Sequence, residues 1–108
     1  MKYKVSFVIV LSLLLATAAF AGEKIAVNPT TATVFVNGPA RSVMLDGFCN
    51  QNPCNLKWSA ILSNNQVGSI DKTSGPQTKF TAGSLPGEAY IFLTDGQGNV
   101  KLVTIHVQ

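Results

Sequence analysis

The sequence predicts an all-β fold, an antiparallel β-sandwich of seven to eight strands. From residue 25 onward, apolar and polar residues alternate with the period of two that is typical of half-buried strands. Clusters of turn-forming residues break this alternation about every eight to twelve residues. From residue 22 onward, no stretch of ten or more residues has its apolar positions at helical spacing. A barrel is the alternative architecture, but the short and irregular segments favour a sandwich.

The first half of the predicted domain contains four alternating segments. Their apolar positions fall within residues 25–27, 34–36, 43–45 and 56–60. An Asn-Pro pair at 28–29 and an Asn-Gly-Pro turn at 37–39 separate the first three segments, and a loop with both cysteines precedes the fourth. Because these residue types favour turns, each segment is predicted to be a separate strand.

The second half continues the same pattern. Its alternating segments fall within residues 67–70, 78–81, 89–93 and 103–107. The breaks between them read KTSGP at 72–76, GSLPG at 83–87 and DGQGN at 95–99. The last of these is a strong hairpin signal, so the two final strands are predicted to pair as neighbours.

Residues 1–21 have the features of a secretory signal peptide. Lys2 and Lys4 precede a long apolar run, which ends at the small-x-small site Ala19-Phe20-Ala21. Cleavage there would leave a single domain of residues 22–108 with no segment inserted in a membrane. We therefore expect a secreted protein, either extracellular or at the cell surface, with the periplasm as the alternative compartment.

The charge of the predicted mature chain argues against nucleic acid as a partner. The full sequence has a net charge of +3. Removing Lys2 and Lys4 leaves six basic residues against five acidic ones, so the mature charge is close to +1. The positive surface that would bind a phosphate backbone is then missing.

Cys49 and Cys54 are the two cysteines of the chain, and we expect them to form a disulfide. An even cysteine pair in an exported protein most simply forms a bridge. Zinc sites need about four ligands, and His106 is the one histidine of the sequence, so no metal is expected. The ring is small and contributes about 2 kcal/mol in the loop-entropy model, so it braces a loop.

Several stretches, in their order along the chain, resemble the bacterial immunoglobulin-like (Big) domain family. They are IAVNPTTATVFVNG, LKWSA, VGSIDKTSG, FTAG, LPGEAYIFLTDGQGN and VTIHV. The resemblance implies an immunoglobulin-like sandwich that serves as a spacer, adhesive or interaction module without catalysis. Such domains usually occur in tandem arrays, whereas one domain follows the signal peptide here. Cys49 and Cys54 are also too close in sequence to join two sheets as in antibody domains.

The alternation predicts which side chains face the core and which face outward. Trp58 is expected in the core, and stacking on a ligand is its alternative role. If Ala89, Ile91 and Leu93 point inward, their neighbours on the same strand point outward. The expected partner surface on this outer face consists of Tyr90, Phe92, Ile61, Leu102 and His106. A register shift of one residue or a bulge would instead place the aromatic residues in the core.

The loop between the cysteines is the second candidate site. Asn50, Gln51, Asn52 and Pro53 would present amide groups on a covalently braced loop, where binding modules often carry recognition residues. The alternative is a stabilised turn without a ligand, since Asn and Pro are ordinary turn formers.

An enzyme is not expected, and no cofactor is implied. His106 lies near the end of the chain, and no phosphate-binding glycine motif precedes a helix. The acidic residues are scattered: Glu23, Asp46, Asp71, Glu88 and Asp95.

We therefore expect a secreted module that docks on a larger cell-surface or extracellular assembly. Its expected partner is another secreted or surface protein or a second copy. The alternatives are a soluble protein that binds a carbohydrate or other surface ligand, with a glycan as partner, and a small secreted protease inhibitor.

Overall fold

The computed structural model describes residues 24–51 and 53–108, which form eight strands and no helix. In order, these strands are β1 (Ile25–Asn28), β2 (Thr31–Val34), β3 (Ser42–Cys49), β4 (Lys57–Leu62), β5 (Gly68–Ile70), β6 (Gln77–Ala82), β7 (Gly87–Thr94) and β8 (Val100–Val107). Within this described part, no helix is long and apolar enough to cross a membrane. The predicted signal peptide, residues 1–21, lies outside the described residues.

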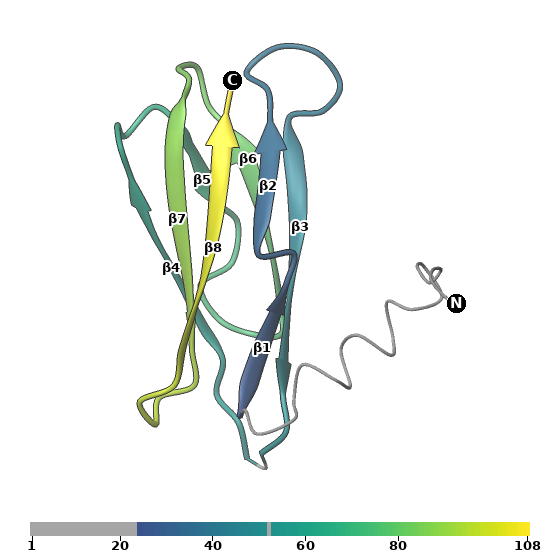
Figure 1. The fold of residues 1–108 in the computed structure, drawn as a ribbon, viewed down its shortest axis with the longest axis vertical. Coiled ribbons are helices and arrows are strands. Elements are labelled where there is room, and N and C mark those ends of the chain that lie inside the picture. The colour runs from purple at the N-terminus through teal and green to yellow at the C-terminus, as the bar shows by residue number, and fades with distance from the viewer. Residues whose placement is uncertain (1–23, 52) are drawn as a thin grey trace, which may run out of the picture.

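The strands form two four-stranded sheets, which confirms the predicted immunoglobulin-like sandwich. We name them sheet A, in the order β1-β3-β6-β5, and sheet B, in the order β2-β8-β7-β4 (Figure 1). Immunoglobulin constant-type domains have the same arrangement, with the first, second, fifth and fourth strands opposed to the third, sixth and seventh. The additional strand here is β2, which is the second half of a divided first strand.

One strand pair departs from the expected antiparallel pattern. β2 runs parallel to β8, with Val34 opposite Val107, while the other strand pairs are antiparallel. The chain leaves sheet A after β1 and joins sheet B at β2, and the cis Asn28–Pro29 peptide bond lies between them. Because Pro29 has no N–H to donate, the break in the ladder falls at a residue that could not have continued it.

The core lies between the two sheets and follows the alternation of the strands. Ala89, Ile91 and Leu93 of β7 are fully buried, as are the inward residues of β8. Trp58 of β4 is 2% exposed, and its indole N–H donates to the carbonyl oxygen of Gly75 at 2.9 Å. Burying Trp58 with its polar N–H satisfied removes a large apolar area from water at no cost in lost hydrogen bonds. Trp58 therefore occupies the expected core position.

Candidate functional site

The outer face of sheet B carries the residues that the sequence predicted as a partner surface. Tyr90 on β7 lies opposite Ile61 on β4, and Phe92 on β7 lies opposite Leu102 on β8. Ile61 is 61% exposed, Leu102 is 44% exposed and Tyr90 is 36% exposed, whereas Phe92 is half-buried. These four side chains share one face because cross-strand neighbours point to the same side of a sheet.

Val100 belongs to the same surface, although the sequence argument did not include it. It is 54% exposed and lies two residues before Leu102 on β8, so both side chains point outward. The signal was present, because the alternation that placed Leu102 outward also places Val100 outward. We call the set Ile61, Tyr90, Phe92, Val100 and Leu102 the apolar face.

Polar and charged residues border the apolar face. At one end, the Nδ1 atom of His106 lies 2.9 Å from the Oε2 atom of Glu88, and both side chains are exposed. At the other end, Lys57 on β4 lies opposite Thr94 on β7, which in turn lies opposite Val100 on β8. An apolar centre with a polar rim is the usual composition of a protein-binding surface. His106 therefore lies at the rim, next to the face it was expected to join.

The outer face of sheet A differs from that of sheet B. The amide nitrogen of Gln77 donates to a carboxylate oxygen of Asp46 at 2.6 Å, across neighbouring strands. Lys79 and Thr81 follow on the same side of β6. Met44 is the large apolar side chain exposed there, at 46%. Among the described residues, the outer face of sheet A thus has Met44 as its exposed large apolar side chain, whereas that of sheet B has Ile61, Tyr90, Val100 and Leu102.

The loop after β3 contains the Cys49–Cys54 disulfide, as expected. Its backbone is also fixed to the start of β1, because the N–H of Asn50 donates to the carbonyl oxygen of Lys24 at 3.1 Å. The amide nitrogen of Gln51 donates to the Oδ2 atom of Asp95 at 2.7 Å. Asn52 lies outside the described residues, and Pro53 is exposed. The loop is therefore held to two other parts of the fold.

Asp95 joins this loop to the hairpin between β7 and β8. Asp95 is only 3% exposed. Its carboxylate accepts hydrogen bonds from the backbone N–H groups of Gln97 at 2.9 Å and Asn99 at 3.2 Å. It also accepts one from the side-chain amide of Asn99 at 2.7 Å. The Asn99 amide makes the largest contribution to lowering the pKa of Asp95 to about 2. The bond from the Gln51 amide to Asp95 holds the loop against the hairpin, which favours the braced-turn interpretation of the loop.

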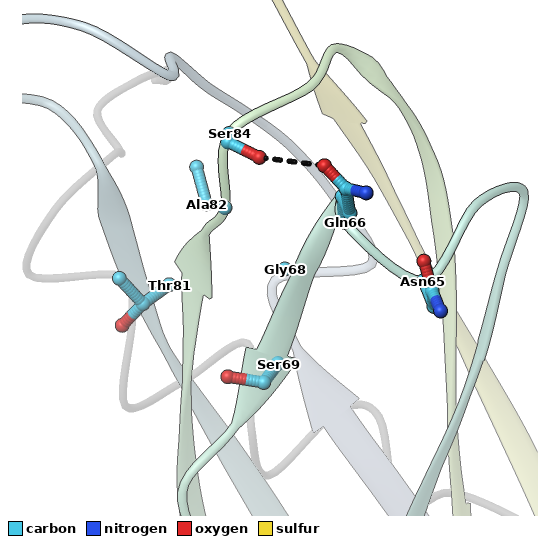
Figure 2. Close-up of a pocket in the computed structure, with 8 residues that line it drawn as sticks. Asn65, Gln66, Gly68, Ser69, Thr81, Ala82 and Ser84 are labelled. Atoms are coloured by element: carbon cyan, nitrogen blue, oxygen red, sulfur yellow. Dashed lines mark hydrogen bonds between the residues drawn. The ribbon is translucent and has the colours of Figure 1, made fainter.

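Two shallow hollows lie outside the apolar face. One, of about 340 Å³, lies beside the disulfide and is lined by Gly47, Cys49, Cys54, Leu56, Gly75 and Pro76. The other, of about 290 Å³, is lined by residues of β5, β6 and the segments that flank them (Figure 2). There the hydroxyl of Ser84 donates to the amide oxygen of Gln66 at 3.1 Å. Neither lining contains an acidic residue, a histidine or a free thiol that could supply acid–base or nucleophilic chemistry.

The described residues also contain no group of three or more His, Cys, Asp or Glu side chains placed to hold a metal ion. The acidic side chains from Asp46 onward have structural contacts instead. Asp71 accepts the N–H of Lys79 at 2.9 Å, and this bond is the main reason why the pKa of Asp71 is lowered. The feature that stands out among the described residues is the exposed apolar face of sheet B.

No protein-family model and no curated protein sequence matches this chain. Several solved structures are similar to it. A Bacteroides ovatus GH5 xyloglucanase in complex with a XXXG heptasaccharide is 11% identical with a TM-score of 0.56, over 78% of this chain and 18% of that one. WR4, a C. elegans MSP family member, is 14% identical with a TM-score of 0.52, over 79% of this chain and 98% of that one.

A third similar structure comprises domains 4 and 5 of the S-layer protein SbsC. It is 16% identical with a TM-score of 0.51, over 79% of this chain and 51% of that one. The chain thus spans about half of the S-layer structure and less than a fifth of the xyloglucanase. At these identities the similarity shows a shared fold, the immunoglobulin-like β-sandwich.

Proposed function

We propose that this protein is a secreted, non-catalytic interaction module that docks on a larger cell-surface or extracellular assembly through the apolar face of sheet B. The observation that carries the proposal is the exposure of Ile61, Tyr90, Val100 and Leu102 on one continuous surface. Contiguous apolar patches of this kind on small domains often bind other proteins. Tyr90 is a suitable anchor, since its ring is amphipathic and loses little conformational entropy on binding.

Two further observations support this proposal. The Cys49–Cys54 disulfide is compatible with an oxidising compartment, as expected for an exported protein. The same fold also occurs as one part of longer chains, among them a structure of S-layer protein domains. Membership of the bacterial immunoglobulin-like domain family belongs to the same proposal, and the strand order of the two sheets supports it.

Replacing Tyr90 and Leu102 together by Ser tests the proposal. Phe92 is left unchanged because it is half-buried and its removal would also reduce stability. The wild-type protein should capture a stoichiometric protein from the native surface and secreted fraction, and the variant should lose at least about tenfold in affinity, as expected when two apolar anchors are removed. The melting temperature of the variant should stay within a few degrees of the wild type, because exposed substitutions change stability by about 0.5 kcal/mol.

Met44→Ser is the matched control, since Met44 is an exposed apolar residue on the opposite face. It should leave capture unchanged. Equal capture by the Tyr90→Ser/Leu102→Ser variant would refute docking through the apolar face. Retention of glycans in place of a protein would favour the carbohydrate alternative, to which Trp58 offers no exposed stacking surface.

A further inference from the structure

β4 lies at one edge of sheet B (Figure 1). In an edge strand, half of the backbone N–H and C=O groups point away from the sheet. The N–H of Ser63, just after the strand, donates to Glu88 of β7 at 2.9 Å, whereas the N–H of Trp58 donates to Thr73 on the other side at 2.9 Å. In an antiparallel pair, successive residues alternate between bonding the neighbouring strand and pointing away from it. Ala60 and Leu62, which share the alternation of Trp58, therefore point their backbone N–H and C=O groups outward.

One part of this outer edge is already covered by the chain itself. The N–H of Gly75 donates to the carbonyl oxygen of Leu56 at 3.0 Å, and Ser74 forms an isolated β-bridge with Lys57. Beyond Trp58 the cover ends, and the outward backbone groups of Ala60 and Leu62 have no partner among the described residues. The free part of the edge is thus residues 59–63.

The free edge of β4 also lacks the features that protect other edge strands. The sequence from Ser59 to Ser63 is SAILS, with neither a charge nor a proline. By contrast, β5 has three residues, and β1 and β2 have four each and are joined through Pro29. Natural proteins usually protect sheet edges with charged residues, prolines, bulges or short strands. An edge without such protection is a template for another strand.

We propose that a second copy of this chain adds its own β4 to this edge, antiparallel and related by a two-fold axis through Ile61. Ala60 of each copy then exchanges both backbone hydrogen bonds with Leu62 of the other, which satisfies the outward groups of both residues. Ile61 faces Ile61 of the second copy as a non-hydrogen-bonded pair, in which side chains approach closely.

The limits of the free segment favour a second copy over an unrelated strand. Residues 59–63 are centred on Ile61, so a two-fold axis there pairs the whole free segment with itself. In one copy, residues 73–75 cover the edge at Trp58, so the pairing between the copies must stop there. At that point β4 of the other copy has already ended, so no pairing is lost. No charged residue lies between residues 58 and 66, so no like charges would meet.

The pairing also extends the apolar face. Tyr90 lies beside Ile61 on the outer side of sheet B, so the two copies would form a continuous row of Tyr90, Ile61 and their symmetry equivalents. The two copies of sheet B would become one eight-stranded sheet that presents both apolar faces on the same side. The inference rests on unpaired backbone groups and does not depend on the proposed function.

Ala60→Pro tests the inference because it removes the outward N–H and leaves the bonds between β4 and β7 intact. Proline is tolerated in edge strands at such positions. Sedimentation equilibrium of the wild-type protein between about 10 µM and about 1 mM, the range in which small interfaces dissociate, should show a shift from the monomer mass toward twice that mass. The Ala60→Pro variant should remain a monomer throughout this range, with strand content by circular dichroism unchanged.

Thr33→Pro is the matched control. Thr33 lies on β2, at the opposite edge of sheet B, and its N–H also points away from the sheet, because the neighbouring Val34 and Val36 bond toward β8. This variant should dimerise like the wild type. A dimer that persists in Ala60→Pro, or a wild-type protein that stays monomeric at every concentration, would overturn the inference. A dimer lost in Tyr90→Ser/Leu102→Ser but kept in Ala60→Pro would place self-association on the apolar face, which also overturns the edge pairing.

Discussion

At the scale of single residues, Gly47 shows how closely the two sheets pack. A Cβ atom added at this position of β3 would lie 2.9 Å from Cδ2 of Leu93 and 3.2 Å from Cζ2 of Trp58. Gly47→Ala should therefore lower the free energy of unfolding by about 1–3 kcal/mol, the usual cost of overpacking. Urea unfolding followed by Trp58 fluorescence would measure this loss.

A double-mutant cycle with Leu93→Val identifies the cause of that loss. Valine lacks the Cδ atoms that the new methyl group would contact most closely, so the double variant should be more stable than the sum of the two single changes implies. A coupling free energy of about 0.5 kcal/mol or more is expected for residues in direct contact. Strict additivity would show that Gly47 is needed for another reason.

Asp95 gives the protein a defined response to acid. Its folded-state pKa is lowered to about 2, chiefly by the Asn99 amide, and the pKa of Asp71 is lowered in the same direction. A carboxylate with a lowered folded-state pKa stabilises the fold fully above its unfolded pKa of about 4, and this stabilisation is lost as the pH falls toward about 2. The urea midpoint should therefore fall between about pH 5 and about pH 2.

Asp95→Asn should be less stable near neutral pH and should show a smaller fall in the urea midpoint over the same pH range. The neutral amide cannot accept as strongly the hydrogen bonds that now converge on Asp95 from Gln51, Gln97 and Asn99. The matched comparison is Asp46→Asn, since the Asp46 carboxylate accepts a hydrogen bond from Gln77 on an exposed face. An equal pH dependence in wild type and Asp95→Asn would contradict this role.

At the scale of elements, strands that span the core could be predicted from sequence, whereas strands at the edges could be predicted only in part. β7 and β8 have regular alternation and a hairpin turn between them, so their inward residues were correctly expected. The segments on either side of Asn28-Pro29 were correctly expected as separate strands, but the parallel pairing of β2 with β8 was not predicted, since it joins residues as far apart as Thr31 and Thr104. Local patterns carry no information on such long-range pairing.

The candidate functional site, too, could be predicted from the sequence only in part. The outward positions of Tyr90 and Leu102 follow from the period of two, and Val100 could have been added by the same rule. The bond from Gln51 to Asp95 could not be predicted, because it joins two loops that are 44 residues apart. The unpaired edge of β4 also required the structure, since the cover by Thr73–Gly75 and its end at Trp58 depend on the tertiary fold.

At the scale of the whole molecule, the two outer faces differ in character while both inner faces contribute to one core. The core side chains come from both sheets and include Leu45 and Phe80 from sheet A and Ile91 and Ile105 from sheet B. A small domain buries only about 60% of its unfolded surface, so its net stability is modest. The apolar area that stays exposed on sheet B is not removed from water on folding, and the proposed function assigns it to a partner.

The net stability of the whole domain also determines how the protein responds to reduction of the disulfide. Cys49 and Cys54 are five residues apart, so in the loop-entropy model their bridge contributes only about 2 kcal/mol. Cys49 and Cys54 pack against the core but are not among its buried residues, so the reduced protein should stay folded and unfold in one cooperative step at a lower urea concentration. Urea unfolding followed by Trp58 fluorescence, with and without dithiothreitol, measures this shift, and Cys49→Ser/Cys54→Ser is the control that should not respond to dithiothreitol. A reduced protein that is unfolded without urea would show instead that this end of the sandwich, where Gln51 and Asp95 join two loops, determines the stability of the whole fold.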